Sequence, residues 1–306
     1  MVMRLAHVEV DGRLRLLRTF FVSRLVARWS RQVKRAGYPR LAVIPHDSIG
    51  REVVFDGMYE KDLLESIFEG ALHEFKQGFA QQVALDVGGN IGNHSMYFAR
   101  RFRKVIAFEP NPPVAKIFEA NCLLNGIRNV ELIQVGLGEQ PARLTFVSNA
   151  GDNIGGSGFI GGSARESDGE VIELPIERGD DVLAQRQLGA RVGLLKIDVE
   201  GFELFALRGL RDTLVRDQPF VLFESHGNSD SGGKAVMNFL RECGYRQFLA
   251  VEKSWRVPRW ARRRGVWPLV EFVQTVIHSP YYRCEPIQEL EDRYYSLLLA
   301  SPSPIM

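Results

Sequence analysis

The chain has 306 residues, a formal net charge of +2 and a globular composition, with 45% hydrophobic and 25% charged residues. This length can bury a substantial core in one decorated α/β domain or in two domains. The near-neutral charge and the absence of an RNA-binding motif argue against a nucleic-acid-binding protein. Three widely spaced cysteines indicate neither a disulfide framework nor a zinc site, so a protein of the reducing cytoplasm is expected.

Residues 1–52 are predicted to form a basic N-terminal arm that contains an amphipathic helix. At 100° per residue, an apolar face and an arginine stripe run side by side: Phe21, Val22, Leu25, Val26, Trp29 and Val33, with Arg24, Arg28, Arg31 and Arg35. Such a helix can lie on anionic lipid, as a membrane-peripheral contact, or pack against its own domain. The longest apolar stretch is interrupted by arginines and is shorter than the roughly 20 residues needed to cross a bilayer.

Residues 53–252 are predicted to form an α/β domain, opening with an amphipathic helix at 59–77. The expected strands are 83–87, 104–110, 129–137, 143–148, 171–177, 192–200, 219–226 and 245–251. The expected helices are 93–102, 112–124, 180–188 with Asp180 or Asp181 as its cap, 202–215 and 232–243. Nearly continuous apolar strands that alternate with helices indicate a mostly parallel sheet covered by helices on both faces.

Two further segments are less regular. The Gly/Ser/Asn-rich stretch 148–169 predicts a long loop, in which Asn153 and Ser157 could contact a polyol. Residues 253–306 are interpreted as a Trp/Arg-rich C-terminal extension, since 253–267 is basic and carries three tryptophans. Such a stretch could hold an anionic glycan or lipid head group, or form a structural clasp.

Polar side chains follow the carboxyl ends of several predicted strands, where open parallel sheets bind their ligands. Six of them are expected to meet at one edge of the sheet: Asp86, Glu109, Asp198, Glu200, Glu224 and His226. A metal site is not indicated, because one histidine among acids without tight spacing is not a distinctive ligand set.

The turn after the first strand, Asp86-Val87-Gly88-Gly89-Asn90-Ile91-Gly92, is too rich in glycine for an ordinary connection. Asn90 replaces a glycine that a dinucleotide-binding turn requires, and the lysine of a phosphate-binding loop is missing. The preceding acid would repel a pyrophosphate and suits a cationic ligand. Glu109, at the end of the second strand, can accept hydrogen bonds from both hydroxyls of a ribose. S-adenosylmethionine, a nucleoside with a sulfonium and no phosphate, meets these requirements.

Four motifs in order resemble the FkbM-type methyltransferases: DVGGNIGNHSMYFA, FEPNP, LLKIDVEGFELFALRG and PFVLFESHG. The stretch FDGMYEKDLL resembles the lead-in of these enzymes, so the resemblance covers about 53–227. It implies a class I, Rossmann-like fold and S-adenosylmethionine-dependent methylation, mostly of hydroxyls on sugars or complex natural products. Gly89 departs from the family's usual alanine, and both ends of the chain fall outside the resemblance.

The resemblance implies a donor site made of one turn and one strand-end acid: Asp86, Gly88, Gly89, Asn90, Gly92 and Glu109. It places Asp86 near the methionine amine of the donor. The adenine is expected to meet backbone groups of 135–138.

Three side chains are candidates for taking the proton of an acceptor hydroxyl: Asp198, Glu200 and His226. A positioned base accelerates such a step about 10²–10⁴-fold. Asp198 and Glu200 are two residues apart and share a strand face, so one could serve the acceptor while the other bonds Lys196 or caps the next helix. His226 titrates near neutral pH but could equally be a structural histidine.

The sequence thus predicts an O-methyltransferase that acts on a hydroxyl of a sugar, glycoconjugate or natural product. Its partner would be a small-molecule or glycan acceptor, with no nucleic acid. N- or carboxyl methylation is the alternative within enzymes. A non-catalytic binding module with a methyltransferase-like fold is the alternative outside them, and a dehydrogenase is opposed by Asn90.

Overall fold

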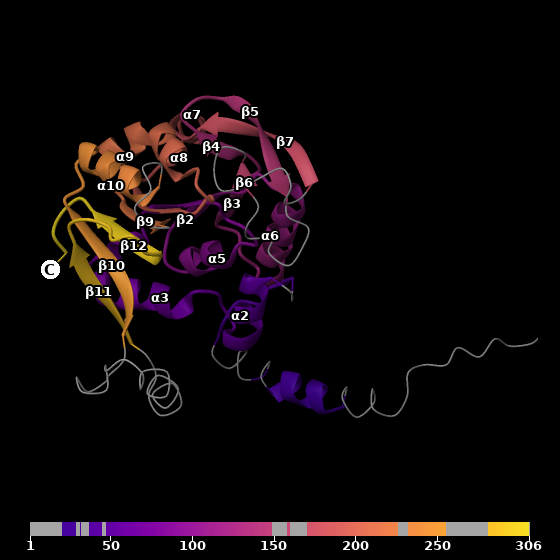
Figure 1. Ribbon diagram of the computed structural model, residues 1–306. Helices are drawn as coiled ribbons and strands as arrows, with labels where there is room; N and C mark the ends of the chain where they lie inside the picture. Colours follow the sequence, from indigo (N-terminus) through magenta and orange to yellow (C-terminus); the bar gives the residue numbers. More distant parts are fainter. Residues whose placement is uncertain are drawn as a thin grey trace, which may run out of the picture.

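The computed structural model in Figure 1 describes residues 20–28, 31, 37–44, 47–148, 158–159, 170–225, 232–254 and 281–305. Three predicted features lie outside the described residues: His226, the loop positions Asn153 and Ser157, and the tryptophan-rich stretch 255–267. Within the described ranges, no helix is both long and apolar enough to span a bilayer.

Eight strands of the described chain form a central sheet in the order β11-β10-β12-β9-β8-β1-β2-β3. Their bounds are β1 (Val83–Val87), β2 (Lys104–Phe108), β3 (Val130–Ile133), β8 (Val192–Ile197), β9 (Phe220–Ser225), β10 (Gln247–Ser254), β11 (Tyr281–Ile287) and β12 (Tyr295–Ser301). The strands from β9 to β3 in this order are parallel, and β10, β11 and β12 are antiparallel additions. The predicted mostly parallel sheet is confirmed.

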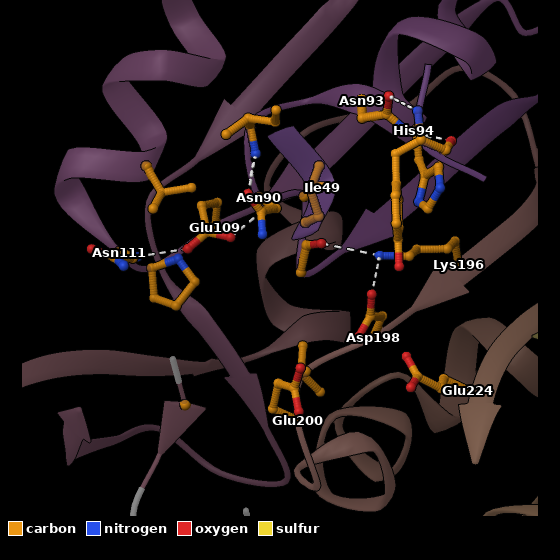
Figure 2. A pocket seen from close by; sticks show the side chains of 18 of the residues that line it. Ile49, Asn90, Asn93, His94, Glu109, Asn111, Lys196, Asp198, Glu200 and Glu224 are labelled. Atoms are coloured by element: carbon orange, nitrogen blue, oxygen red, sulfur yellow. Dashed lines mark hydrogen bonds and ion pairs between the residues drawn. The ribbon is translucent and has the colours of Figure 1, made fainter. Parts of the chain in front are cut away.

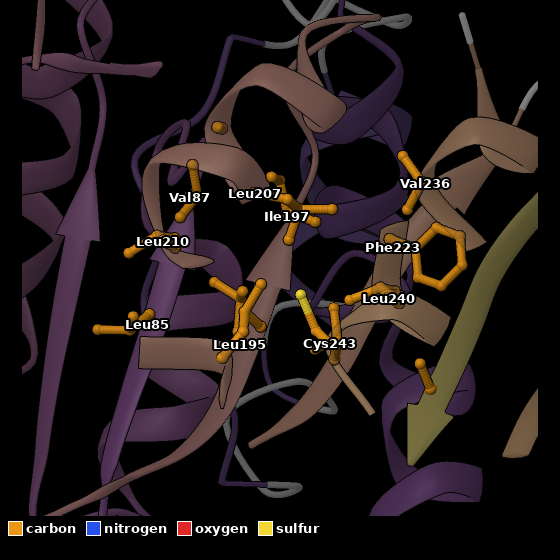
Figure 3. Packing of buried hydrophobic residues seen from close by; sticks show 14 of the residues in the cluster. Leu85, Val87, Leu195, Ile197, Leu207, Leu210, Phe223, Val236, Leu240 and Cys243 are labelled. Carbon is orange, nitrogen blue, oxygen red and sulfur yellow. The ribbon is translucent and has the colours of Figure 1, made fainter. Parts of the chain in front are cut away.

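Helical segments cover both faces of this sheet. They are α2 (Ser48–Asp56), α3 (Lys61–Ser66), η1 (Ile67–Ala71), η2 (His73–Phe75), α4 (Lys76–Phe79), α5 (Asn93–Ala99), α6 (Pro112–Leu124), α7 (Gly179–Ala184), α8 (Glu203–Gly209), α9 (Arg211–Asp217) and α10 (Gly233–Glu242). Adjacent residues of one strand point to opposite faces. Leu195 therefore packs with Leu207 and Leu240 in one core (Figure 3), whereas Leu194 packs with Phe68 and Phe98 in another.

Two described parts of the predicted C-terminal extension, 281–287 and 295–301, are strands of the central sheet. Strand β12 lies between β9 and β10, and its residues Leu298, Leu299 and Ala300 are fully buried. The proposed boundaries at 52/53 and 252/253 fall inside α2 and β10. The position of β12 in the sheet could not be predicted from the sequence, because the order of strands depends on pairing between distant segments.

A smaller sheet of the described residues has the order β4-β7-β5-β6 and lies at the top of the view in Figure 1. It consists of β4 (Gly136–Gly138), β5 (Ala142–Ser148), β6 (Gly158–Phe159) and β7 (Glu170–Arg178). The single strand predicted at 129–137 is therefore divided between two sheets. A Cβ on Gly136 or Gly138 would lie 2.6 Å from the Ile176 side chain, so these glycines permit the close approach of β4 to β7.

The N-terminal amphipathic helix is present over the described residues 20–28. Its apolar side chains are exposed, with Phe21 at 64% and Leu25 at 60%, and the guanidinium of Arg24 lies 4.1 Å from the centre of the Phe20 ring. These side chains do not join the core clusters of the described part of the chain.

The helix predicted at 202–215 is divided into α8 and α9, and the reason is a buried carboxylate. Asp180 does not cap its own helix α7, as the sequence suggested, and neither does Asp181. Instead the Asp180 carboxylate accepts hydrogen bonds from the backbone N–H groups of Asp212 (2.8 Å) and Thr213 (3.0 Å), and from the Thr213 hydroxyl (2.6 Å). It thereby caps the N-terminus of α9.

Replacing this cap tests its role. We expect Asp180→Ala to lower the free energy of unfolding by roughly 2–4 kcal/mol, because it leaves two buried donors and one part-buried donor without their acceptor. Asp181→Ala is the matched control, since the Asp181 side chain is 56% exposed and its ion pair with Arg178 contributes less than about 1 kcal/mol. Equal losses for both variants in denaturant titrations would contradict the capping role.

Candidate functional site

A cavity of about 250 Å³ lies at the carboxyl edge of β1, β2, β8 and β9 (Figure 2). Its described lining includes the glycine turn 88–91 and the acids Glu109, Asp198, Glu200 and Glu224. Parallel strands bring these groups together from distant parts of the sequence, as predicted. In Figure 2, Glu109 and Asn111 lie at one end of the cavity and His94 at the other.

The glycine turn depends on backbone that carries no side chain. Gly88 has φ +79°, and a Cβ there would lie 1.8 Å from the carbonyl oxygen of Asp198, so only glycine fits between β1 and the end of β8. Gly92 has φ +87° and Asn90 φ 47°, and the Asn90 amide oxygen accepts a hydrogen bond from Ile91 N–H (2.7 Å). The turn thus follows the first strand with its backbone facing the cavity.

Gly89, which stands where the family usually has alanine, has a structural explanation. A Cβ at this position would lie 2.9 Å from Cε2 of Phe118, a buried residue of α6. The glycine and the large aromatic ring therefore compensate for each other.

Glu109 is 7% exposed and has its carboxylate fixed by two backbone donors. Its Oε2 accepts a hydrogen bond from Asn90 N–H and its Oε1 accepts one from Asn111 N–H, both at 2.9 Å. Burial raises the pKa of Glu109 to about 7, against the opposing effect of these two hydrogen bonds. A carboxylate has about four acceptor positions, so the described residues leave about two for a ligand.

Asp86 and Lys196 are partners in the parallel register of β1 and β8. Asp86 is fully buried; it accepts a hydrogen bond from the Ser95 hydroxyl (2.5 Å), and its Oδ1 lies 3.7 Å from Lys196 Nζ. The ammonium also donates to the Gly88 carbonyl (3.1 Å) and to Asp198 (3.2 Å). Burial opposes the charge on Lys196, but Asp198 and Asp86 outweigh it and raise its pKa.

Among the described residues that line the cavity, Asp86 is absent, although the sequence placed it beside the donor amine. The carboxylate lies behind the turn and contacts Lys196, which does line the cavity. Residues 135–138, expected near the adenine, are likewise absent from the described lining, and Phe146 and Phe159 of the small sheet line the cavity instead.

Two acids that follow β8, Asp198 and Glu200, line the cavity together with Glu224, which lies near the carboxyl end of β9. Burial, and then the nearby Asp198, raise the pKa of Glu200 to about 7. Burial and Asp198 also hold the pKa of Glu224 well above its usual range, although a hydrogen bond with Tyr294 acts against this. The N–H groups of Val199 and Gly201 are bonded by Glu203, so Glu200 is not needed as a cap of the following helix.

Sequence reasoning missed a second group of lining residues from the segment before β1. The side-chain amide of Asn93 bonds both N–H (3.1 Å) and C=O (3.0 Å) of Tyr59. The neighbouring His94 Nε2 lies 3.3 Å from Glu60. The lead-in motif FDGMYEKDLL contains Tyr59 and Glu60, and its resemblance to the family could have indicated that these residues lie near the site. Within the described chain, no three His, Cys, Asp or Glu side chains are arranged to hold a metal ion.

Residues 86–247 match the family model of the methyltransferase FkbM domain, which is more than half of the chain. The chain belongs to the FkbM methyltransferase family. The family is one of methyltransferases, and membership of it implies S-adenosylmethionine as the methyl donor.

Several known methyltransferases are similar to this FkbM-family chain. Methyltransferase 1 of Beauveria bassiana is 30% identical over 146 residues, which cover 42% of this chain and 58% of that protein. The hexuronic acid methyltransferase AglP of Haloferax volcanii is 27% identical over 185 residues, covering 60% and 69%. The crystal structure of an FkbM methyltransferase from Methylobacillus flagellatus has a TM-score of 0.42 and 15% identity, covering 94% of this chain and 60% of that one.

The buried ion pair under the turn gives a stability prediction. Lys196→Met should lower the free energy of unfolding by roughly 3–5 kcal/mol, because Asp86 would keep a buried charge without a cation. Lys104→Met is the matched control, since its pair with Glu131 (2.6 Å) is about one-third exposed and contributes less than about 1 kcal/mol. Denaturant titration measures both, and a Lys196→Met loss no larger than the control would show that the pair is not structurally important.

Proposed function

We propose that this FkbM-family enzyme transfers a methyl group from S-adenosylmethionine to a hydroxyl of a sugar, glycoconjugate or natural product. The observation that carries the proposal is that one cavity contains both a ribose-type clamp, Glu109, and acids suited to an acceptor proton, Asp198 and Glu200. The donor and the acceptor would then meet in the same enclosed space.

The described residues fit the donor. The Glu109 carboxylate, held by two backbone N–H groups, has acceptor positions left for the two ribose hydroxyls. The turn 88–91 offers backbone at which a nucleoside can approach closely. The lining is acidic, because the charge of Lys196 is already paired with Asp198. Such a lining suits a sulfonium and would repel phosphates. When bound, S-adenosylmethionine supplies an electrophilic methyl group.

Asp86 contributes to donor binding through its neighbours in this proposal. It holds the ammonium of Lys196 against the Gly88 carbonyl, and it anchors Ser95 in the first helix after the turn. The carboxylate therefore fixes the shape of the turn and positions the residues that touch the donor.

On the acceptor side, Glu200 is the proposed base. Its pKa of about 7 makes it ionised at slightly alkaline pH yet basic enough to take a proton from a hydroxyl as the oxygen becomes methylated. Asp198, fixed by Lys196, positions the acceptor. His226, the third candidate from the sequence, follows the end of β9 directly. A carboxylate acceptor is disfavoured, because it would face Asp198, Glu200 and Glu224.

The donor clamp can be tested by calorimetry. Glu109→Gln should weaken donor binding roughly 10–100-fold, because two hydrogen bonds to a charged acceptor are weakened. Glu139→Gln is the control, since the Glu139 side chain is 53% exposed. Unchanged donor affinity in Glu109→Gln would remove this residue from the donor site.

The same clamp predicts a pH dependence. Because the ionised carboxylate is the form that accepts both ribose hydroxyls, donor affinity should rise as the pH increases through about 7. In Glu109→Gln this dependence should be largely lost. A wild-type affinity that is constant between pH 6 and pH 8 would contradict the assignment.

The base is tested by turnover with isotopically labelled donor and sugar acceptors. Glu200→Gln should lower kcat about 10²–10⁴-fold while the donor dissociation constant stays within about twofold. Wild-type turnover should rise with pH through about 7, as Glu200 loses its proton. If Glu200→Gln kept wild-type turnover, the proton would have to leave by another group.

A further inference from the structure

We infer that a second cavity is the acceptor site. It lies next to the cavity of about 250 Å³ described above, which we call the donor cavity. The acceptor would be a polyhydroxylated ring that is neutral or carries an amine, not a carboxylate. A neutral sugar or an amino sugar fits this description. The inference rests on the proposed function and adds the acceptor's binding place and charge class.

The second cavity has a volume of about 600 Å³ and is built from both ends of the described chain. Segment 52–63 provides one wall, and strands β10, β11 and β12 with the connection before β12 provide the other. Both walls lie outside residues 86–247, the part that matches the family model. Most of the first wall belongs to the lead-in FDGMYEKDLL, which resembles the family, whereas the second wall, from β10, β11 and β12, lies outside that resemblance.

The two cavities share a wall. Tyr59 and Tyr294 line both of them. Asn93, which follows the glycine turn, clamps the Tyr59 backbone through two hydrogen bonds, and Tyr294 bonds Glu224 of the donor cavity. A ring held in the second cavity would therefore lie next to the acids at which the hydroxyl must be methylated.

A buried polar atom at this junction also points to a ligand. His94 is 7% exposed and lines the donor cavity, and its Nε2 forms no hydrogen bond with the described residues. When the imidazole is protonated, its Nε2 forms an ion pair with Glu60, 3.3 Å away, and Glu60 lines the second cavity. Buried polar atoms normally have partners, so an acceptor hydroxyl entering between the cavities is a fitting partner for this histidine.

The lining chemistry matches a sugar ring. Tyr59, Tyr282 and Tyr294 offer aromatic faces that pack against C–H groups, and phenol groups that bond hydroxyls. Glutamate and aspartate carboxylates are good acceptors for further hydroxyls.

The charge of the lining sets the preference within this class. Four carboxylates of the described chain face two lysines: Glu52, Asp56, Glu60 and Asp62, with Lys61 and Lys253. Lys61 already lies 3.7 Å from Asp62 and 4.9 Å from the centre of the Tyr38 ring. The excess of negative charge would repel a uronic acid and attract an amine. This enzyme should therefore differ from AglP, the relative named for hexuronic acid.

The test is a binding comparison with three probes of equal size: methyl glucoside, methyl glucosaminide and methyl glucuronide. Each is added to the full-length enzyme saturated with S-adenosylhomocysteine, and binding is followed by saturation-transfer NMR and titration. The inference predicts that the neutral and amino sugars bind and that the glucuronide binds at least about tenfold more weakly. Asp56→Asn with Asp62→Asn, both exposed, should reduce this discrimination.

The location is tested with two tyrosine variants. Tyr282→Ala, which removes a ring that lines the second cavity and is absent from the described lining of the first, should weaken binding of the sugar probes at least about tenfold and leave the donor dissociation constant within about twofold. Tyr281→Ala is the control, since Tyr281 neighbours the lining residue Tyr282 on β11 but is absent from the described lining. The control should bind the probes like the wild type.

Each contrary result has a distinct meaning. Equal binding of the glucuronide would overturn the charge preference, and unchanged probe binding in Tyr282→Ala would overturn the location. Absence of binding by all three sugars, with tight S-adenosylhomocysteine binding by calorimetry, would overturn this inference while leaving the proposed function standing. Failure of the wild type to bind S-adenosylhomocysteine would overturn the proposed function and this inference together.

Discussion

One buried ammonium connects the central sheet to the ligand site. Lys196 reaches Asp86 on the neighbouring strand, the Gly88 carbonyl in the turn, and Asp198 at its own strand end. A buried lysine is costly unless its charge is compensated, and here two carboxylates and a carbonyl compensate it. Lys196 thereby links strand β1, the glycine turn and the end of β8 at the edge of the cavity.

Different parts of the chain surround the two cavities. The parallel strands end at the first cavity, where Glu109 is fixed by backbone N–H groups and where Asp198, Glu200 and Glu224 are also part of the lining. The N-terminal segment before β1 and the antiparallel strands β10, β11 and β12 surround the second cavity instead. In our proposal, the first cavity holds the methyl donor and the second holds the acceptor.

Much of this architecture could be predicted from local patterns. The nearly continuous apolar strands and the helices between them indicated a parallel sheet, and the acids at the strand ends indicated the edge where Glu109, Asp198, Glu200 and Glu224 meet. The order of the strands could not be predicted, because the insertion of β12 between β9 and β10 depends on pairing between distant residues. The same limit concealed the contact of Asp86 with Lys196, which requires the register of β1 and β8. For the same reason, the sequence could not predict that Tyr59 and Tyr294 line the same two cavities.

The central claim is that the bend after β1 holds a nucleoside whose ribose lies on Glu109. A crystal structure of the enzyme with S-adenosylhomocysteine tests it most directly. The account predicts both ribose hydroxyls within hydrogen-bond distance of the Glu109 carboxylate and the amino-acid end of the ligand near Lys196 and Asp198. A ligand bound elsewhere, or a ribose that does not contact Glu109, would contradict it.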